Sequence, residues 1–260
     1  MVAPFGAFLI AWHGSLQHEI IHGHPTRSRR LNTAIASIPL GLWMPFGVYR
    51  ALHLAHHRTG ELTDPLDDPE SFYVTRSAWT RAGSLRRLLL RANTTLVGRL
   101  VVGPWLAVLG FLASELRRLA DGDRSHLGAW VKHLAGVALI VAWLRLVGVP
   151  IASYLLLFVY PGLALTLLRS FAEHRPGATN AERIVIVEAG PIASLLFLNN
   201  NLHVVHHDEP ALPWYELPAR YRADRDSILE RNGGYLFRGY DAIAARFALR
   251  AKDAPVHPHA

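Results

Sequence analysis

The chain has 260 residues, 51% of them hydrophobic, a formal net charge of +7 and a mean hydropathy of +0.17, which is above what a soluble enzyme usually needs. It contains no cysteine, which excludes disulfides, zinc–thiolate sites, iron–sulfur clusters and cysteine nucleophiles, and leaves histidine and carboxylate as the plausible metal ligands. Its arginines lie mainly between apolar runs, a pattern typical of cytoplasmic membrane flanks rather than of a surface that binds nucleic acid.

Five apolar runs predict helices, at 33–49, 95–114, 134–147, 150–168 and 186–198. A bilayer crossing takes about 20 apolar residues, so 95–114 and 150–168 qualify as spans, whereas the other three are short enough to be broken, tilted or partly interfacial. The sequence therefore predicts an all-α integral-membrane protein with about four to five transmembrane or re-entrant helices. The alternative is a soluble all-α protein in which these runs are core helices, because several fall below spanning length.

The two ends of the chain differ in character. Only twelve residues precede His13, and as a helix they span about 18 Å, which is too short to cross a bilayer. We therefore expect the natural reading frame to extend upstream by one membrane-spanning segment. The stretch 211–260 is charged and mixed, with amphipathic character around 236–250, and is predicted to form a cytoplasmic cap and tail. Residues 1–260 are predicted to form one domain.

Three histidine clusters stand out, with the sequences HEIIH at 18–22, HLAHH at 53–57 and HVVHH at 203–207. Two HxxHH clusters are expected by chance in only about one such chain in a thousand. Residues at i, i+3 and i+4 share one helical face, so each cluster is predicted to aim its imidazoles at one point. Eight imidazoles are too many for one ion and suit a pair, which predicts a two-metal site, and each cluster adjoins an apolar run, which places that site at one membrane surface.

The first cluster also has an alternative interpretation, and not every histidine outside the clusters is expected to bind metal. HEIIH also matches the HExxH pattern of zinc hydrolases, in which two histidines bind zinc and the glutamate acts as base, but such a site would not explain the two HxxHH clusters. Isolated histidines on apolar helices are usually hydrogen-bonded packing residues, and this interpretation is preferred for His13, His24, His126 and His133. His257 and His259 fall in the predicted tail.

At these clusters the chain resembles the membrane fatty-acid desaturase superfamily, whose members share three histidine boxes on a di-iron centre. The resemblance runs from about His13 to Pro218. Outside the boxes, features similar to the bacterial branch that contains carotenoid ketolases are His22-Gly23, His56-His57-Arg58, Asp67-Asp68-Pro69, and Pro213-Trp214-Tyr215 with Pro218. The chain departs from the family in lacking a helix before the first box, which puts the placement of that box in question.

The resemblance implies two iron ions with nine ligands, which by position are His18, His22, His53, His56, His57, His174, His203, His206 and His207. His174 ends the long run 150–168, and its alternative role is a surface cap on a helix C-terminus. Asn199 or Asn200 is expected to hold a metal-bound water or an imidazole tautomer. Four acidic residues either orient imidazoles or form a solvated loop, namely Asp64, Asp67, Asp68 and Glu70.

The activity implied is that of an O₂-dependent di-iron oxidoreductase that desaturates a fatty-acyl or lipid chain in the membrane. The alternatives are a hydroxylase or ketolase of a carotenoid or other lipid and, from another class, a non-enzymatic or zinc-binding membrane protein. The chain has no dinucleotide-binding glycine fingerprint and no cysteine, so an external electron donor such as a ferredoxin is expected to dock on the basic face. The expected location is a bacterial inner membrane, with the active site facing the cytoplasm.

Overall fold

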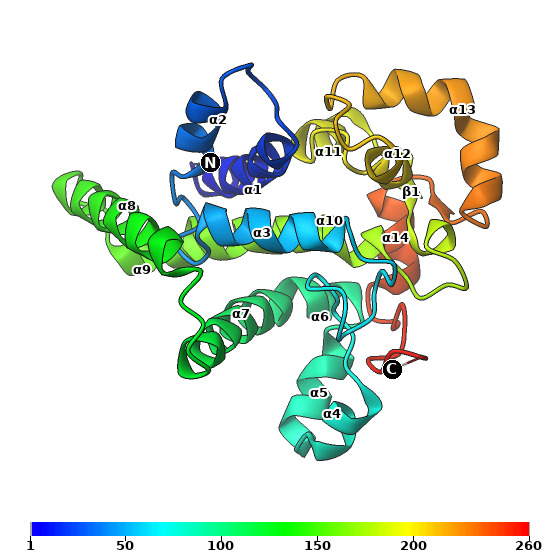
Figure 1. The fold of residues 1–260 in the computed structure, drawn as a ribbon, viewed down its shortest axis with the longest axis horizontal. Coiled ribbons are helices and arrows are strands. Elements are labelled where there is room, and N and C mark those ends of the chain that lie inside the picture. Colours follow the sequence, from blue (N-terminus) through cyan, green and yellow to red (C-terminus); the bar gives the residue numbers. More distant parts are fainter. Residues whose placement is uncertain (1, 260) are drawn as a thin grey trace.

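The computed structural model describes residues 2–259, which form a mostly helical fold (Figure 1). Helix α1 (Val2–Ile21) packs along α10 (Tyr160–Glu173), and α3 (Phe46–His56) contacts α1. Helix α10 continues α9 (Ile151–Tyr154) through a π-helical turn, η1 (Leu155–Val159). The turn lies just before Pro161, whose ring nitrogen has no hydrogen for the regular helical bond. The three helices α1, α3 and α10 form the frame on which the site is built.

Two described helices are long and apolar enough to cross a membrane. They are α8 (Leu127–Leu146), which has 20 residues, and the continuous helix Ile151–Glu173, which has 23. Helix α8 extends away from the body of the fold (Figure 1), and only 11% of its apolar window is buried. A core helix of a soluble protein buries its apolar face, so the exposure of α8 agrees with contact to lipid. The predicted runs 134–147 and 150–168 each overlap one of these helices in all but one residue, and the first belongs to a helix longer than its apolar run suggested.

Two of the predicted helices are broken by proline. The run 33–49 is divided between α2 (Arg29–Ala36) and α3, with Pro39 and Pro45 in the turn that separates them. The prediction that 95–114 is one spanning helix is wrong, because α6 (Leu96–Val101) ends before α7 (Gly103–Ala120) begins. Proline cannot donate the backbone hydrogen bond of a helix interior, and the second break, at Val102, lies two residues before Pro104.

The prediction of a helix over 186–198 is also wrong. Residues Ile186–Val187 form strand β1, which pairs in parallel with β2 (Leu236–Phe237), and only Pro191–Leu196 is helical, as α11. Ile186 and Val187 are both fully buried, and they pack into two different apolar clusters on the two sides of the strand. A short strand buried on both faces has the same unbroken apolar sequence as a buried helix, so periodicity cannot tell the two apart.

The C-terminal cap is ordered around this strand pair. It contains the helices α13 (Leu217–Arg231) and α14 (Tyr240–Phe247), so the amphipathic stretch at 236–250 is β2 followed by α14. The remaining short elements are α4 (Arg76–Arg81), α5 (Ser84–Ala92), η2 (Ala181–Arg183) and α12 (His203–Asp208).

The expectation that His257 lies in a tail is wrong. Its side chain is 2% exposed and its Nε2 lies 3.0 Å from the hydroxyl of Thr63, in the loop that follows α3. The backbone of the same segment pairs with that loop, since Val74 N donates to Pro255 O and His257 N donates to Val74 O. The segment is therefore held in place by the loop behind the second histidine box, a contact between residues that lie far apart in the sequence.

Candidate metal centre

The nine candidate ligands come from the ends of four helices. His18 lies in the last turn of α1 and His22 follows its end, the second box closes α3, and the third box forms α12. His174 directly follows α10. Because these ends meet at one place, residues far apart in the sequence converge on a single site. The first box is thus carried by α1, which answers the doubt about its placement.

The structure brings all nine together, in two adjoining groups. In each group, one nitrogen from every residue lies within 4.8 Å of the others. The first group consists of His18, His22, His53, His57 and His206, and the second of His56, His174, His203 and His207. The groups meet where the rings of His57 and His207 stack with their centroids 4.4 Å apart.

Each HxxHH box supplies both groups, so the prediction that a box aims all its imidazoles at one point is wrong. In the second box the i and i+4 residues, His53 and His57, join the first group, and His56 joins the second. In the third box this is reversed, because His203 and His207 join the second group and His206 the first. Successive helical positions are about 100° apart, so the i+3 side chain points to one side of the i, i+4 pair.

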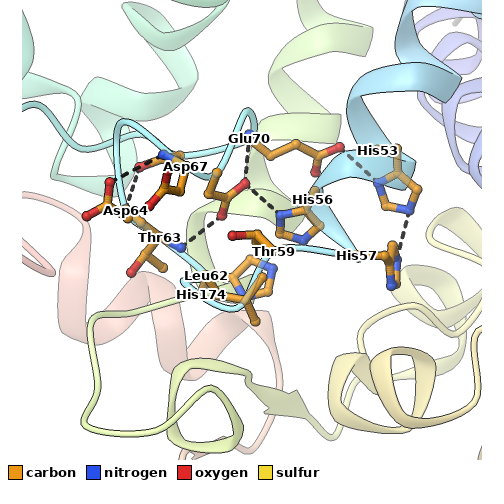
Figure 2. A network of polar contacts seen from close by, with 12 residues as sticks. His53, His56, His57, Thr59, Leu62, Thr63, Asp64, Asp67, Glu70 and His174 are labelled. Carbon is orange, nitrogen blue, oxygen red and sulfur yellow. Dashed lines mark hydrogen bonds and ion pairs between the residues drawn. The ribbon is translucent and has the colours of Figure 1, made fainter.

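Ring nitrogens on the far side of three imidazoles are held by protein acceptors. His53 Nδ1 donates to Glu70 Oε1 at 2.9 Å, as Figure 2 shows, and His56 Nδ1 donates to Asp68 Oδ1 at 2.8 Å. His203 Nδ1 donates to Asn200 Oδ1 at 3.0 Å. A proton on Nδ1 leaves the lone pair on Nε2, which in each case is the nitrogen directed toward the other imidazoles.

The acidic loop therefore divides into two kinds of residue. Asp68 and Glu70 orient imidazoles, whereas Asp64 accepts backbone hydrogen bonds from Leu66 and Asp67 within its own turn. Asp67 is exposed and contacts no candidate ligand among the described residues. The two residues that orient imidazoles, Asp68 and Glu70, are the last two of the four in sequence, in an irregular segment that turns back toward α3 (Figure 2).

The two asparagines before the third box also differ. Asn200 is 1% exposed, accepts from His203 and places its amide nitrogen 3.4 Å from His18 Nε2, so it contacts both groups. Asn199 donates instead to the backbone oxygen of Trp214 and contacts no imidazole among the described residues. Of the two, Asn200 is thus the residue placed to fix an imidazole tautomer.

Sequence reasoning missed a buried ion pair beside the second group. Arg169 Nε lies 2.7 Å from Glu173 Oε1, one helical turn away on α10, and both side chains are less than a tenth exposed. The same carboxylate oxygen lies 3.6 Å from His203 Nδ1. The signal was present, because ionisable residues inside an apolar helix are energetically expensive and commonly mark a functional site.

The environment keeps several of these imidazoles neutral. Burial, followed by the neighbouring imidazoles, lowers the pKa of His57 and of His174 to about 3 and that of His207 well below its usual value. His56 is the exception, because the carboxylates of Glu70 and Asp68 outweigh the effect of burial and raise its pKa to about 9. A neutral imidazole has a free lone pair, so the low pKa values suit metal binding.

The geometry fits a pair of cations. Nε2 atoms of seven of the nine residues lie 3.0–3.2 Å from the Nε2 of another, and the buried Nε2 of His56 has no hydrogen-bond partner within residues 2–259. Such convergent lone pairs are mutually unfavourable until a metal ion lies between them.

The surroundings of Glu19 do not suit the zinc-hydrolase interpretation, in which this residue is the base. Glu19 is buried and accepts a hydrogen bond from the backbone nitrogen of Trp214. Five imidazoles, rather than the two of the HExxH pattern, surround the position that zinc would occupy.

The four isolated histidines are hydrogen-bonded packing residues, as expected. His13, His24 and His133 each donate from Nε2 to a backbone oxygen, of Ile35, Ala211 and Leu42 respectively. His126 pairs through Nδ1 with the carboxylate of Glu115. None of the four belongs to either imidazole group.

Replacing Asp68 with alanine should weaken metal binding by the second group about 10- to 100-fold, because His56 loses the acceptor that fixes its tautomer and orientation. The backbone nitrogen of Thr63, which donates to the other oxygen of Asp68, also loses its partner, which should lower stability by about 1–3 kcal/mol. Metal titration of purified protein checks the first effect and thermal unfolding the second. The matched control is Asp67→Ala, and equal metal affinity in the two variants would contradict the role of Asp68.

Comparison with known proteins agrees with this geometry. The family model "Fatty acid desaturase" matches residues 1–239, which is most of the chain and includes all three histidine boxes. No curated protein matches the chain. A model that covers more than half of the sequence shows family membership, and the histidine clusters lie inside the matched range. The chain therefore belongs to the fatty acid desaturase family, a family of oxidoreductase enzymes.

Proposed function

We propose that the protein desaturates a fatty-acyl or lipid chain in the membrane, using O₂ and two iron ions held by the nine imidazoles. The observation that carries the proposal is the pair of adjoining imidazole groups in a chain of the desaturase family. The overall reaction balances as –CH₂–CH₂– + O₂ + 2 e⁻ + 2 H⁺ → –CH=CH– + 2 H₂O. It needs two electrons from a donor outside the chain, because the sequence has no cysteine for an iron–sulfur cluster.

The residues of the site have distinct parts in this reaction. When bound, iron supplies the oxidising chemistry with O₂ that an unactivated C–H bond requires and that amino-acid side chains lack. The imidazoles hold the ions, and Glu70, Asp68 and Asn200 keep His53, His56 and His203 in the tautomer that presents Nε2. All three of these histidines are at most 2% exposed, so the protein keeps bulk water away from the reacting centre.

We propose that the chain is integral to a bacterial inner membrane, with α8 and 151–173 as spans and the imidazole groups on the cytoplasmic side. Arg117 and Arg118 at the end of α7 and Arg124 in the loop before α8 support this orientation, since basic residues favour the cytoplasm. Reporter fusions after Gly122 and at the C-terminus should then report the cytoplasm, and a fusion after Gly148 the periplasm. A periplasmic C-terminus would refute the orientation.

We propose that the electron donor docks at a basic groove beside His174. The groove has a volume of about 230 Å³ and is bordered by four basic side chains and one acidic one, which are Arg175, Arg246, Arg250, Lys252 and Asp253. Lys252 Nζ donates to the backbone oxygen of His174 at 2.7 Å, so the groove is one residue away from the second imidazole group. The excess of positive charge is complementary to an acidic one-electron carrier such as a ferredoxin.

Reversing two charges of this groove should impair reduction by the donor. Arg246→Glu combined with Arg250→Glu should raise the KM for an acidic ferredoxin about tenfold and leave turnover with a small chemical reductant unchanged, because only docking depends on these exposed side chains. The control is Arg222→Glu, which changes an exposed arginine on α13 outside the groove. If the double variant and Arg222→Glu raised the KM equally, the groove would not be the docking surface.

Lipid and pigment profiling of a strain that expresses the protein tests the proposed reaction. Metal analysis of the purified enzyme tests the proposed iron content. Desaturation predicts a new double bond in an acyl chain and iron near two per chain. An oxygenated lipid or carotenoid in place of the double bond would establish a hydroxylase or ketolase. Zinc in place of iron would refute the proposed oxidoreductase chemistry.

A further inference from the structure

The segment between the second histidine box and α8 carries positive charge without compensating acids. No aspartate or glutamate occurs between Glu70 and Glu115, whereas six arginines do, namely Arg76, Arg81, Arg86, Arg87, Arg91 and Arg99. The first five lie in the short helices α4 and α5, which with α7 form the lower edge of the fold in Figure 1. Such a cluster beside membrane helices is typical of a surface that meets anionic lipid headgroups.

Helix α5 turns its apolar side outward. Leu85 and Leu88 lie at i and i+3, share one side of the helix, and are 67% and 63% exposed. The side chain of Arg87 points instead toward α4, where its Nε donates to the backbone oxygen of Trp79 at 3.0 Å and its Nη2 to that of Thr80 at 2.7 Å. A surface helix in water normally buries its leucines and exposes its arginines, so this reversed arrangement indicates an apolar environment outside α5.

Helix α7 continues this exposed apolar surface. Trp105, Leu109 and Leu116 lie at i, i+4 and i+11, which places them on one face, and each is more than half exposed. The other side of the helix packs inward, because the ring of Phe111 stacks with that of Trp130 on α8 at a centroid distance of 5.9 Å. Helix α7 therefore buries one apolar face and leaves a second apolar face exposed.

The proposed membrane orientation places both ends of α7 on one side of the bilayer. Its first residues follow α6, where Leu96 belongs to the same apolar cluster as Phe171, at the end of α10 that leads to His174. Its last residues lead to Gly122, in the cytoplasmic loop before α8. Because both ends are cytoplasmic, α7, which has 18 residues and a length of about 27 Å, lies along the membrane surface rather than across it.

We propose that α5 and α7 form an interfacial anchor in the cytoplasmic leaflet. Their exposed apolar side chains insert just below the lipid headgroups, and the exposed guanidinium groups of Arg86 and Arg91 bind anionic phospholipid. An anionic lipid is preferred to a zwitterionic one because it brings no cation of its own to repel the arginines. The inference rests on the proposed orientation but not on the proposed reaction, and it assigns the run 95–114 to the membrane surface.

The absence of cysteine allows single-cysteine fluorescent labelling of the purified full-length protein in lipid nanodiscs. Leu88→Cys and Leu109→Cys place the label on the two helices, and phosphatidylcholine with a nitroxide at a shallow or a deep position of its acyl chain reports the depth. We expect at least about threefold more quenching by the shallow nitroxide, because an interfacial helix lies only about 5–10 Å into the bilayer. In the matched control, Leu66→Cys, the label should escape both quenchers, because Leu66 is 79% exposed but lies in the acidic loop.

Phosphatidylglycerol and phosphatidylcholine with the same shallow nitroxide test the lipid preference. The label of Leu88→Cys should be quenched at least about threefold more by phosphatidylglycerol, since one arginine near an anionic surface contributes about fivefold in affinity. Arg86→Gln combined with Arg91→Gln should abolish this preference, while the quenching by phosphatidylcholine persists. The control is Arg222→Gln combined with Arg238→Gln, which removes two exposed arginines outside α4–α7 and should leave the preference unchanged.

The outcomes separate the anchor from the proposed function. Stronger quenching of Leu109→Cys by the deep nitroxide would overturn the anchor, because α7 would then cross the bilayer. If neither nitroxide quenched the labels, the exposed face would lie outside the membrane, and energy transfer between two labelled copies would identify it as a dimer interface. Equal quenching by the two headgroups would overturn the anionic preference. A protein that binds no iron but shows the expected quenching would refute the proposed function and support the anchor.

Discussion

Replacing His206 with alanine should abolish turnover, by more than about 100-fold, and deplete iron from the first group. Removing a residue that only orients a ligand typically lowers metal affinity or activity about 10- to 100-fold. The loss of activity should be larger here, because His206 is itself one of the imidazoles of the first group. Its Nε2 lies 3.0 Å from that of His57, and its ring packs against His18 and His22 with centroids 4.5 and 4.7 Å away. Iron analysis and a single-turnover assay on purified protein measure the two effects.

The control for this variant is His13→Ala. His13 is also on a helix near the centre and is 9% exposed, but its ring donates only to the backbone oxygen of Ile35. Its loss should spare iron content and lower stability by about 1–3 kcal/mol, through the unpaired carbonyl. If His206→Ala turned over at the unmodified rate, the imidazole groups would not be the redox centre.

Replacing His174 with alanine should remove iron from the second group and lower activity more than about 100-fold, while the protein stays folded. The alternative, that His174 caps α10, predicts a loss of about 1 kcal/mol in stability and full activity. The geometry favours the ligand, since His174 Nε2 lies 3.1 Å from His203 Nε2 and belongs to the second imidazole group. The backbone oxygen of His174, which accepts from Lys252, is unchanged by the substitution.

Iron content and thermal unfolding together separate the two roles of His174. His24→Ala is the matched control, because His24 is half-buried and donates to the backbone oxygen of Ala211 without belonging to either imidazole group. If the His174→Ala protein had the iron content and rate of the unmodified enzyme, His174 would be a helix cap and not a metal ligand. Iron near one per chain, with unchanged unfolding, is the result expected if the second group alone is lost.

The chemistry of the centre could be predicted from the sequence because it depends on local spacing. Histidines at i, i+3 and i+4 lie on neighbouring parts of one helical turn whatever the rest of the fold does, so their closeness to one another follows from helix geometry. The absence of cysteine further restricted the possible metal ligands to histidine and carboxylate. The helix Ile151–Glu173 was also recognisable, since a continuous apolar run of about 20 residues without an internal break has few other uses, whereas α8 was predicted only as the shorter run 134–147.

The division of ligands between the two groups needed the tertiary structure. His56 and His57 are adjacent in sequence yet belong to different groups, because neighbouring positions on a helix point about 100° apart and only the packing of α1, α10 and α12 around α3 decides what each meets. In the same way, Asp67 and Asp68 are indistinguishable by composition, but the path of the irregular loop turns only Asp68 toward His56.

Sequence alone thus determined the ligand type, the helical spacing of the boxes and the family, since these are properties of short segments. The tertiary structure decided that 186–198 contains a strand as well as a helix, which acidic residues orient imidazoles, and that His257 packs against the loop behind the second box. The physical reason is the range of the interactions. Backbone geometry acts over one helical turn, whereas burial and hydrogen-bond pairing depend on contacts between residues up to 195 positions apart.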